Sequence, residues 1–429
     1  MIGTNDTPEA RASPDEITGP GYAELCVTSN FTFLTGASYP EELVTRAAEL
    51  GLAAIAITDR NSLAGVVRAY SALKTLRREA DEAIRIRSQH RTDSSSRQEV
   101  GAPQPIERPH AAHLPKLIVG ARLVLRDSDV HWLALPTDRA AYQRLTRLLT
   151  LGKRRAEKGD CHLDRQDLLE GCTGMILIAL PQGRLEQAYA HIAEIRRRYP
   201  GHVFLGSAPR YDGSDQACLA ALAHLAQRTA APMVAVGDVL MHRAGRRQLA
   251  DVLTCMRERI TIDQIGTRAL PNAERRLKGA RDMARVFYDY PGALRRTLEI
   301  AARCSFCLSE LSYEYPDEIA DGEAPQARLE RLTREGLARR CPNGVPDRYL
   351  PMVKKELDLV EDLGFAAYFL TVHDIVLHAR EIGILCHGAR VCGELDPVLG
   401  TGDHRCQPRA DFHGLRAVHL EVPGRAARH

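Results

Sequence analysis

The clearest pattern in the chain is an apolar run that starts at Leu52 and ends at Asp59. A run of small and β-branched residues without polar alternation is typical of a strand buried on both faces of a parallel sheet. A helix-capping residue follows, Asn61 or Ser62, and apolar residues then recur at helical spacing. The pattern predicts a strand, a loop and a helix, with the Asp59 carboxylate at the sheet edge where α/β barrels keep their chemistry.

Strand-like and helix-like segments alternate through the first half of the chain. The predicted strands are Tyr22 to Ser29, Leu52 to Asp59, Leu117 to Leu125, Val130 to Leu135, Met175 to Leu180, His202 to Leu205 and Met233 to Val239. The predicted helices are Ser38 to Gly51, Leu63 to Tyr70, Arg139 to Leu151, Leu185 to Tyr199 and Ala217 to Arg228. Repeated alternation of this kind favours a (β/α) barrel or a doubly wound sheet.

After residue 243 the strand signals stop and only helical periodicity remains. A segment rich in proline, glycine and acidic residues, YEYPDEIADGEAP, divides these helices and predicts a linker. The predicted helices are Arg246 to Arg257, Arg281 to Phe287, Pro291 to Cys304, Gln326 to Arg340 and Tyr349 to Leu363.

Two stretches lack the apolar residues that a packed core needs. Residues 1–20 are polar, contain three prolines and show no periodicity, so we expect a loose tail. Residues 84–113 are almost entirely polar after their first few positions. Such a segment buries too little apolar surface to offset the entropy lost on ordering, so we expect a disordered insertion.

Composition narrows the class of protein. The chain has 429 residues and 44% hydrophobic content, enough for two or three domains. The 58 basic and 55 acidic residues leave a net charge of +3, so any contact with DNA must be local. Eleven cysteines without CxxC pairs, no signal peptide and no long apolar span predict reduced thiols, a cytoplasmic location and no membrane partner.

The segment YAELCVTSNFTFLTGASYPEELVTRAAELGLAAIAITDRNSLAGVV resembles the start of a PHP (polymerase and histidinol phosphatase) domain. More closely, it is similar to the N-terminus of bacterial C-family DNA polymerases of the polymerase III alpha type, in their error-prone branch. Later segments such as TCMRERITID and GFAAYFLTVHDIVLHAREIGILCHG resemble the connection toward thumb and palm. The resemblance covers about Gly21 to Gly388. It implies an α/β fold with a PHP-type distorted (β/α)7 barrel over residues 21–243, an all-helical connector over 244–312 and a partial palm and thumb segment over 313–388.

A PHP site holds two or three divalent ions with histidine, carboxylate and sometimes cysteine ligands at strand ends. The resemblance implies which positions would supply them, and this sequence has lost most of the expected residues. Cys26 and Thr28 stand where the family has a His-x-His pair, and Asp59 and Arg60 where it has an Asp-His pair. Arg122 replaces a glutamate.

Three further positions complete the degenerate pocket. Asp238 keeps the carboxylate of an Asp-x-His pair whose histidine is lost, His242 follows it, and Glu24 lies on the first strand. Two arginines would repel cations, so we expect no bound metal. Cys26 can equally be a small buried hydrophobe, and His242 a surface side chain.

Without an ion, the carboxylates of Asp59 and Asp238 would repel each other and lose solvation together. The sequence predicts that a guanidinium offsets them, from Arg60 or from Arg122, because arginine stays protonated and binds carboxylates bidentately. His373 and Asp374 are adjacent within a helical segment and are interpreted as a structural pair rather than a catalytic one.

After Gly388 the resemblance continues only in another reading frame. The family follows His387 and Gly388 with Arg-Gly-Ser-Ala-Ala-Asn-Ser, a glycine-rich loop whose amides can approach the phosphates of the incoming nucleotide. This chain reads ARVCGEL, yet one allowed coding of Ala389 to Leu395, read one base later, spells the family loop. We therefore expect residues 389–429 to be a frameshifted, non-native tail, with His387 and Gly388 as a loop remnant.

These observations predict an N-terminal fragment of an error-prone, damage-induced DNA polymerase. By family, the full-length enzyme is a DNA-directed nucleotidyltransferase that uses Mg²⁺ and DNA, with accessory or sliding-clamp proteins as further partners. The palm aspartates lie beyond the matched segment, so we expect this chain to be inactive and to carry no cofactor. Two alternatives stay open. A free-standing PHP phosphoesterase would be recognised by metal content and ester hydrolysis, and a non-catalytic scaffold by pull-down of polymerase-associated proteins.

Overall fold

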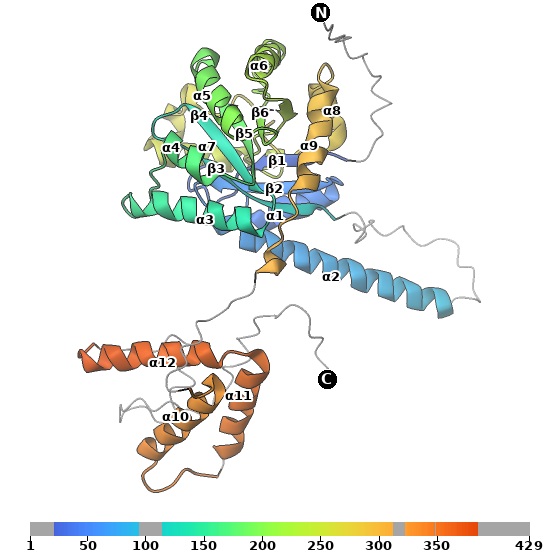
Figure 1. Ribbon diagram of the computed structural model, residues 1–429. Helices are drawn as coiled ribbons and strands as arrows, with labels where there is room; N and C mark the ends of the chain where they lie inside the picture. The colour runs from blue at the N-terminus through green and yellow to red at the C-terminus, as the bar shows by residue number, and fades with distance from the viewer. Residues whose placement is uncertain (1–20, 94–113, 312–321, 348, 385–429) are drawn as a thin grey trace, which may run out of the picture. The chain divides into compact units, whose positions relative to one another are not determined.

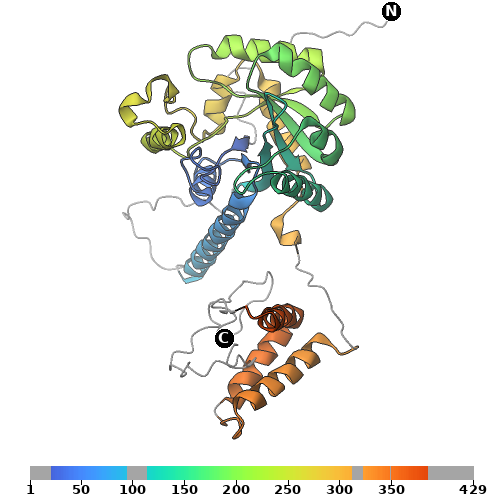
Figure 2. The same cartoon turned by 90° about the vertical axis from the view of Figure 1, so that its left-hand side faces the viewer.

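The computed structural model describes residues 21–93, 114–311, 322–347 and 349–384, which form two compact units that divide after Glu310. The first unit holds the described strands and helices α1 to α9, and the second holds α10 to α12 (Figures 1 and 2). Among the described helices, none combines the length and hydrophobicity that a membrane crossing requires.

The first unit is built on a curled seven-stranded sheet whose strands follow one another in chain order. They are β1 (Ala23–Val27), β2 (Ala54–Arg60), β3 (Lys116–Leu123), β4 (Val130–Pro136), β5 (Met175–Pro181), β6 (Val203–Ser207) and β7 (Met233–Ala235). Neighbours are parallel, except that β4 is antiparallel to both β3 and β5. A short turn joins β3 to β4, and such a turn can link only antiparallel strands. The α/β class and the PHP-type barrel expected from the sequence are confirmed, with β4 as a reversed strand.

The two edges of the sheet meet beyond β7. The amide of Val239 donates to the carbonyl of Cys26 at 2.9 Å, and the amide of Thr28 donates to the carbonyl of Val239 at 2.9 Å. These two bonds form a parallel bridge between the end of β1 and the segment after β7. The C-terminal ends of the first and last strands are therefore held side by side.

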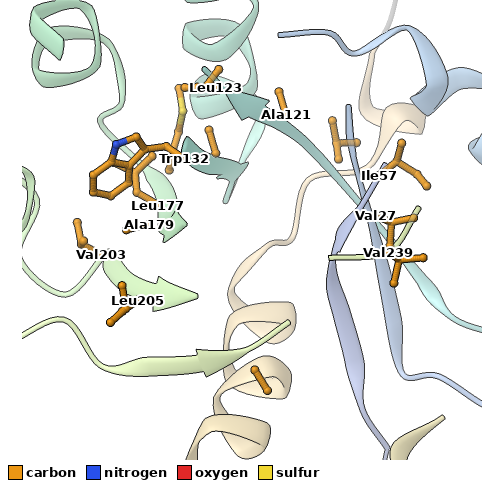
Figure 3. Close-up of a cluster of buried hydrophobic side chains, with 14 of the residues drawn as sticks. Val27, Ile57, Ala121, Leu123, Trp132, Leu177, Ala179, Val203, Leu205 and Val239 are labelled. Carbon is orange, nitrogen blue, oxygen red and sulfur yellow. The ribbon is translucent and has the colours of Figure 1, made fainter. Parts of the chain in front are cut away.

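Helices cover the outer face of the sheet and bury a continuous apolar core against it. Trp132, Leu177 and Leu205 belong to this core, and Figure 3 shows them together on adjacent strands. The covering helices are α1 (Pro40–Glu49), α2 (Ala64–Asp93), α3 (Arg139–Arg154), α4 (Arg165–Gly171), α5 (Leu185–Arg198) and α6 (Asp215–Thr229).

Helix α2 corrects one expectation. The sequence predicts irregular chain from Ile84, but α2 continues to Asp93, so that prediction is wrong for its first ten residues. The segment EADEAIRIR is rich in alanine, glutamate and arginine, which lose little side-chain entropy in a helix. Local propensity thus favours a helix through Ile86, where the side chains after Ala80 are mostly exposed. The rest of the segment, residues 94–113, lies outside the described residues, as do residues 1–20.

The predicted connector helices belong to the barrel unit. They are α7 (Arg247–Glu258), α8 (Ala280–Val286) and α9 (Pro291–Arg303). Ile300, Ala301 and Cys304 join the apolar cluster inside the barrel, and Ala301 accepts a hydrogen bond from Lys116 Nζ at 2.8 Å, where β3 begins. Helix α9 therefore closes the N-terminal end of the barrel and leaves the C-terminal end as the mouth.

The second unit is a small helical assembly of α10 (Pro325–Arg340), α11 (Leu350–Leu363) and α12 (Ala366–Glu381). A cluster that includes Leu329, Val360 and Phe369 joins the three helices. Their positions match the two helices predicted after the linker and the segment FAAYFLTVHDIVLHARE that follows them.

The candidate site at the barrel mouth

The mouth gathers side chains from strands that are distant in sequence. Cys26 lies near the end of β1, Asp59 near the end of β2, Arg122 near the end of β3, and Asp238 just after β7. Register places Arg60 of β2 beside Arg122 of β3. Parallel strands bring their C-terminal ends to one edge, so most of the positions predicted from the sequence are neighbours in the fold.

The centre of the mouth is an ion-pair cluster around Asp238. Arg122 Nη2 donates to Asp238 Oδ1 and also to Cys26 Sγ, the latter at 2.9 Å. Arg275 Nη2 donates to the other carboxylate oxygen, Oδ2, and Arg275 Nε donates to the main-chain oxygen of Asp238 at 3.0 Å. Asp238 is thus held by two arginines, and one of them also contacts the thiol.

The backbone at Asp238 is adapted to this arrangement. Its φ of 44° lies in the left-handed region, which residues other than glycine seldom adopt, although aspartate tolerates it better than most. The bonds from Arg275 to both the side chain and the main chain of Asp238 hold this conformation. The strained backbone of Asp238 therefore orients its carboxylate toward Arg122.

The charges at the centre stabilise one another. Burial opposes ionisation of Asp238, but Arg122 and Arg275 outweigh it, so the pKa of Asp238 lies well below its usual range. Burial likewise disfavours the charged form of Arg122, yet Asp238 raises the pKa of Arg122 above its ordinary value. Burial raises the pKa of Cys26 to about 12, against the lowering effect of Arg122. At neutral pH the site is an ionised carboxylate bound by two guanidinium groups, beside a neutral thiol.

Asp59 does not take part in the ion-pair cluster around Asp238. Its carboxylate accepts from the amide of Ser29 at 2.8 Å, from Ser29 Oγ at 2.7 Å and from Thr32 Oγ1 at 2.8 Å. Burial raises the pKa of Asp59, and these neutral donors oppose the rise. The prediction of an arginine partner for Asp59 is therefore wrong, because Ser29 and Thr32 of the loop after β1 donate hydrogen bonds to both carboxylate oxygens. Arg60 is exposed.

Glu24 occupies the seam between β1 and the segment after β7. Its carboxylate is fully buried and accepts from the amides of Cys26 and Gly237 at 3.0 Å, and from the hydroxyl of Tyr22 at 2.8 Å. Burial raises the pKa of Glu24 to about 7 against these donors. A Cβ at Gly237 would lie 2.4 Å from Glu24 Oε2, so only glycine leaves room for the carboxylate. The Glu24 carboxylate thus accepts hydrogen bonds from backbone amides on both sides of this seam, in place of strand-to-strand bonds.

The remaining predicted residues lie elsewhere. His242 Nδ1 bonds with Ser38 Oγ at 2.8 Å and lies 3.7 Å from Glu42 Oε2. Thr28 is buried and takes part in the bridge to Val239 through its amide. His387 and Gly388 lie outside the described residues. The structure thus joins the side chains of Cys26, Arg122 and Asp238, whereas those of Asp59, Glu24 and His242 have other hydrogen-bond partners.

Two residues near the centre were missed by sequence reasoning. Arg275 comes from a loop more than thirty residues beyond the last strand, and no local pattern marks it. His131 of β4 has a buried Nδ1 without a hydrogen-bond partner. Burial, Arg122 and Arg60 lower its pKa to about 4, so it is neutral at physiological pH. A histidine inside an otherwise apolar strand is the signal that could have marked His131.

The residues of the mouth do not fit a metal ion. Within the described part of the chain, no three histidine, cysteine or carboxylate side chains are grouped as metal ligands. Arg122 contacts both Cys26 and Asp238, the two candidate ligands at the centre, and Cys26 is held as a neutral thiol. A metal would have to displace a guanidinium from its salt bridge and ionise a buried thiol.

His373 and Asp374 are placed in the second unit, on α12. His373 Nδ1 lies 3.0 Å from Asp374 Oδ1, and Arg328 of α10 lies 3.3 Å from Asp374 Oδ2. Asp374 therefore links α12 to α10, and the structural role of the pair stays a prediction.

Family profiles match two parts of the chain. A PHP domain profile matches residues 24–229, and a profile of the bacterial DNA polymerase III alpha NTPase domain matches residues 327–393. Among solved structures, a metal-dependent phosphoesterase from Bifidobacterium adolescentis covers 51% of the chain at 14% identity with a TM-score of 0.33. An amidohydrolase from Chromobacterium violaceum covers 51% at 13% identity with a TM-score of 0.34.

Curated relatives match over most of the chain. The error-prone DNA polymerase of Ruegeria pomeroyi is 79% identical over 367 residues, which are 86% of this chain and 33% of the relative. Those of Rhodopseudomonas palustris (strain BisB5) and Caulobacter vibrioides are 45% and 41% identical, covering 86% of this chain and 30% and 31% of the relative. The chain thus spans about a third of the length of these relatives. It carries a PHP domain followed by part of a polymerase III alpha NTPase domain, and over most of its length it is similar to the N-terminal third of error-prone DNA polymerases.

Proposed function

We propose that the whole protein copies damaged DNA as an error-prone, DNA-directed DNA polymerase in the cytoplasm, and that this chain alone transfers no nucleotide. The observation that carries the proposal is the 79% identity to an error-prone DNA polymerase over 367 residues. Mg²⁺ would serve the whole enzyme by neutralising charge on the nucleotide phosphates. The isolated Asp396, Asp403 and Asp411 of this chain do not reproduce the paired carboxylates that such ions need.

Within that enzyme, we propose that the barrel mouth is structural and holds no metal. The contacts of Arg122 with both Asp238 and Cys26 favour this role over the alternative of a PHP phosphoesterase. A barrel without chemistry of its own also suits the second alternative, a scaffold for polymerase-accessory or sliding-clamp proteins.

We also propose that the reading frame shifts after Gly388. The matches to eight relatives all cover 86 or 87% of the chain. The match of 367 residues to the Ruegeria pomeroyi relative is about as long as the segment from Gly21 to Gly388. Sequencing the gene across codons 380 to 410 and comparing it with that relative decides the point, because an unshifted frame would refute the proposal.

Primer extension tests the polymerase assignment. The purified chain, supplied with a primed template, deoxynucleotides and Mg²⁺, is expected to add no nucleotide above a mock purification, while the full-length Ruegeria pomeroyi relative extends the primer. A version of the chain joined in frame to the remaining two thirds of that relative is expected to regain extension. Extension by the chain alone, or none by the joined protein, would contradict the proposal.

Metal analysis and ester hydrolysis test the barrel mouth. We expect well under one equivalent of zinc or manganese per chain and no hydrolysis of p-nitrophenyl phosphate with either metal added, because Arg122 occupies the ligand positions. Asp238→Asn is the matched variant, since it removes the strongest candidate ligand with little change in shape. Stoichiometric metal that is lost in this variant would show that the mouth is a metal site.

A further inference from the structure

Helix α3 carries an exposed basic face that the barrel does not explain. The helix contains five basic residues and no acidic residue, whereas the whole chain has a net charge of only +3. Every other α-helix of the described residues carries at least one aspartate or glutamate. A general excess of arginine would therefore not by itself produce a helix of this length without any carboxylate.

Four of the five cations are free to meet a partner. Arg144 is engaged, since its Nε donates to the carbonyl of Thr173 at 2.7 Å. The other four are exposed, and none forms an ion pair with the described residues: Arg139, Arg147, Lys153 and Arg154. The nearest carboxylate before the helix, Asp138, is its N-cap and accepts from the amide of Ala141 at 2.7 Å.

The geometry of α3 arranges these cations along one line. With 3.6 residues per turn, Arg139, Arg147 and Arg154 fall within about a quarter of the helix circumference. Gln143 and Thr150 are exposed between them and add polar groups to the same face. Sixteen residues span about 24 Å, so the face runs the length of the helix. The opposite side, which includes Leu145 and Leu149, is buried against the sheet, and Figure 1 shows α3 on the outside of the barrel.

Helix stability does not account for this face. Cations in the last turn, such as Lys153 and Arg154, interact favourably with the helix dipole, but Arg139 stands in the first turn, where a cation is unfavourable. Cations at both ends and in the middle of the helix are instead complementary to an extended, negatively charged partner. DNA presents one negative charge per about 1.7 Å of its axis, and a 24 Å face would lie along about seven base pairs.

We propose that the exposed face of α3, defined by Arg139, Arg147, Lys153 and Arg154, binds the phosphate backbone of double-stranded DNA without reading its sequence. One side of α3 packs on the sheet and its exposed face carries cations and an amide, so we expect it to contact phosphates and not base edges. The choice of DNA over another polyanion rests on the proposed polymerase function. The site lies on the outside of the barrel and is distinct from the cluster at the mouth.

Fluorescence anisotropy with a labelled DNA duplex of about twenty base pairs tests the proposal on the full chain. Four phosphate contacts predict that affinity falls on the order of a hundredfold between 50 and 200 mM salt. The triple variant Arg139→Gln, Arg147→Gln, Arg154→Gln keeps helix propensity and is expected to bind at least about tenfold more weakly. Its salt slope should fall by about 3, one unit for each phosphate contact removed.

The matched control removes the same charge from other exposed arginines that form no ion pair with the described residues, through Arg197→Gln, Arg281→Gln and Arg285→Gln. It is expected to bind like the unaltered chain. Equal weakening in both triple variants, unchanged binding in the α3 variant, or tighter binding of an RNA duplex or single strand than of the DNA duplex would overturn the proposal. The assay needs neither nucleotide nor metal, so its outcome is independent of the primer-extension test.

Discussion

A chain cut after residue 243 is expected to lose cooperative unfolding, whereas a chain cut after Glu310 is expected to keep it. The first cut removes α9, whose Ile300 is fully buried in the cluster inside the barrel. It also removes Thr297, whose Oγ1 accepts from the amide of Ala23 at 3.3 Å. Without α9 the N-terminal end of the barrel would open its apolar interior to water. Urea unfolding followed by circular dichroism distinguishes the two chains.

A single substitution gives a milder form of the same test. Ile300→Ala in the full chain is expected to lower the free energy of unfolding by about 2 to 5 kcal/mol, the usual cost of a cavity in a core. Ile262→Ala is the matched control, because Ile262 lies in the same connector but is 53% exposed, and its loss should cost less than about 0.5 kcal/mol. A shorter chain that unfolds cooperatively at the midpoint of the longer one would show that α9 is dispensable.

Arg122→Ala is expected to lower the free energy of unfolding by about 3 kcal/mol. Removing one partner of a buried pair typically costs about 3 to 5 kcal/mol, because the other charge is left without its counter-ion. The side chains of Arg122 and Asp238 are only 13% and 22% exposed, so water screens them poorly. Arg275 still binds Asp238 in the variant, which places the expected loss at the lower end of the range. Chemical denaturation at pH 7 measures the loss.

A double-mutant cycle tests whether Arg122 is energetically coupled to Asp238 and not to Asp59. Asp238→Asn, which keeps a side chain that tolerates the left-handed backbone, should cost at least about 1 kcal/mol less in the Arg122→Ala background than alone. Asp59→Asn should cost the same in both backgrounds, because Ser29 and Thr32 hold its carboxylate. Additive losses for Arg122 and Asp238 would show that their contact does not stabilise the fold.

The amino-acid sequence by itself predicts the seven strands of the barrel unit in their observed order and each covering helix except α4, although it ends α2 too early. Hydrophobic periodicity acts locally, so the strand at Leu52 and the helix from Arg139 can be read from neighbouring residues. Alternation alone leaves barrel and doubly wound sheet open, and the family resemblance decides between them. The sequence also marks the mouth residues at strand ends, since parallel strands share one C-terminal edge.

Only the tertiary structure decides which charged side chains form ion pairs. Asp59 and Asp238 look alike in sequence, each directly after an apolar run, yet one is satisfied by hydroxyls of an adjoining loop and the other by two arginines. Arg275 is far from any strand in sequence and reaches the site because the chain folds back after η4 (Gly266–Arg268). Likewise, the interior position of Ile300 follows from how α9 packs. Local periodicity carries no information about such long-range partners, because they depend on the path of the whole chain.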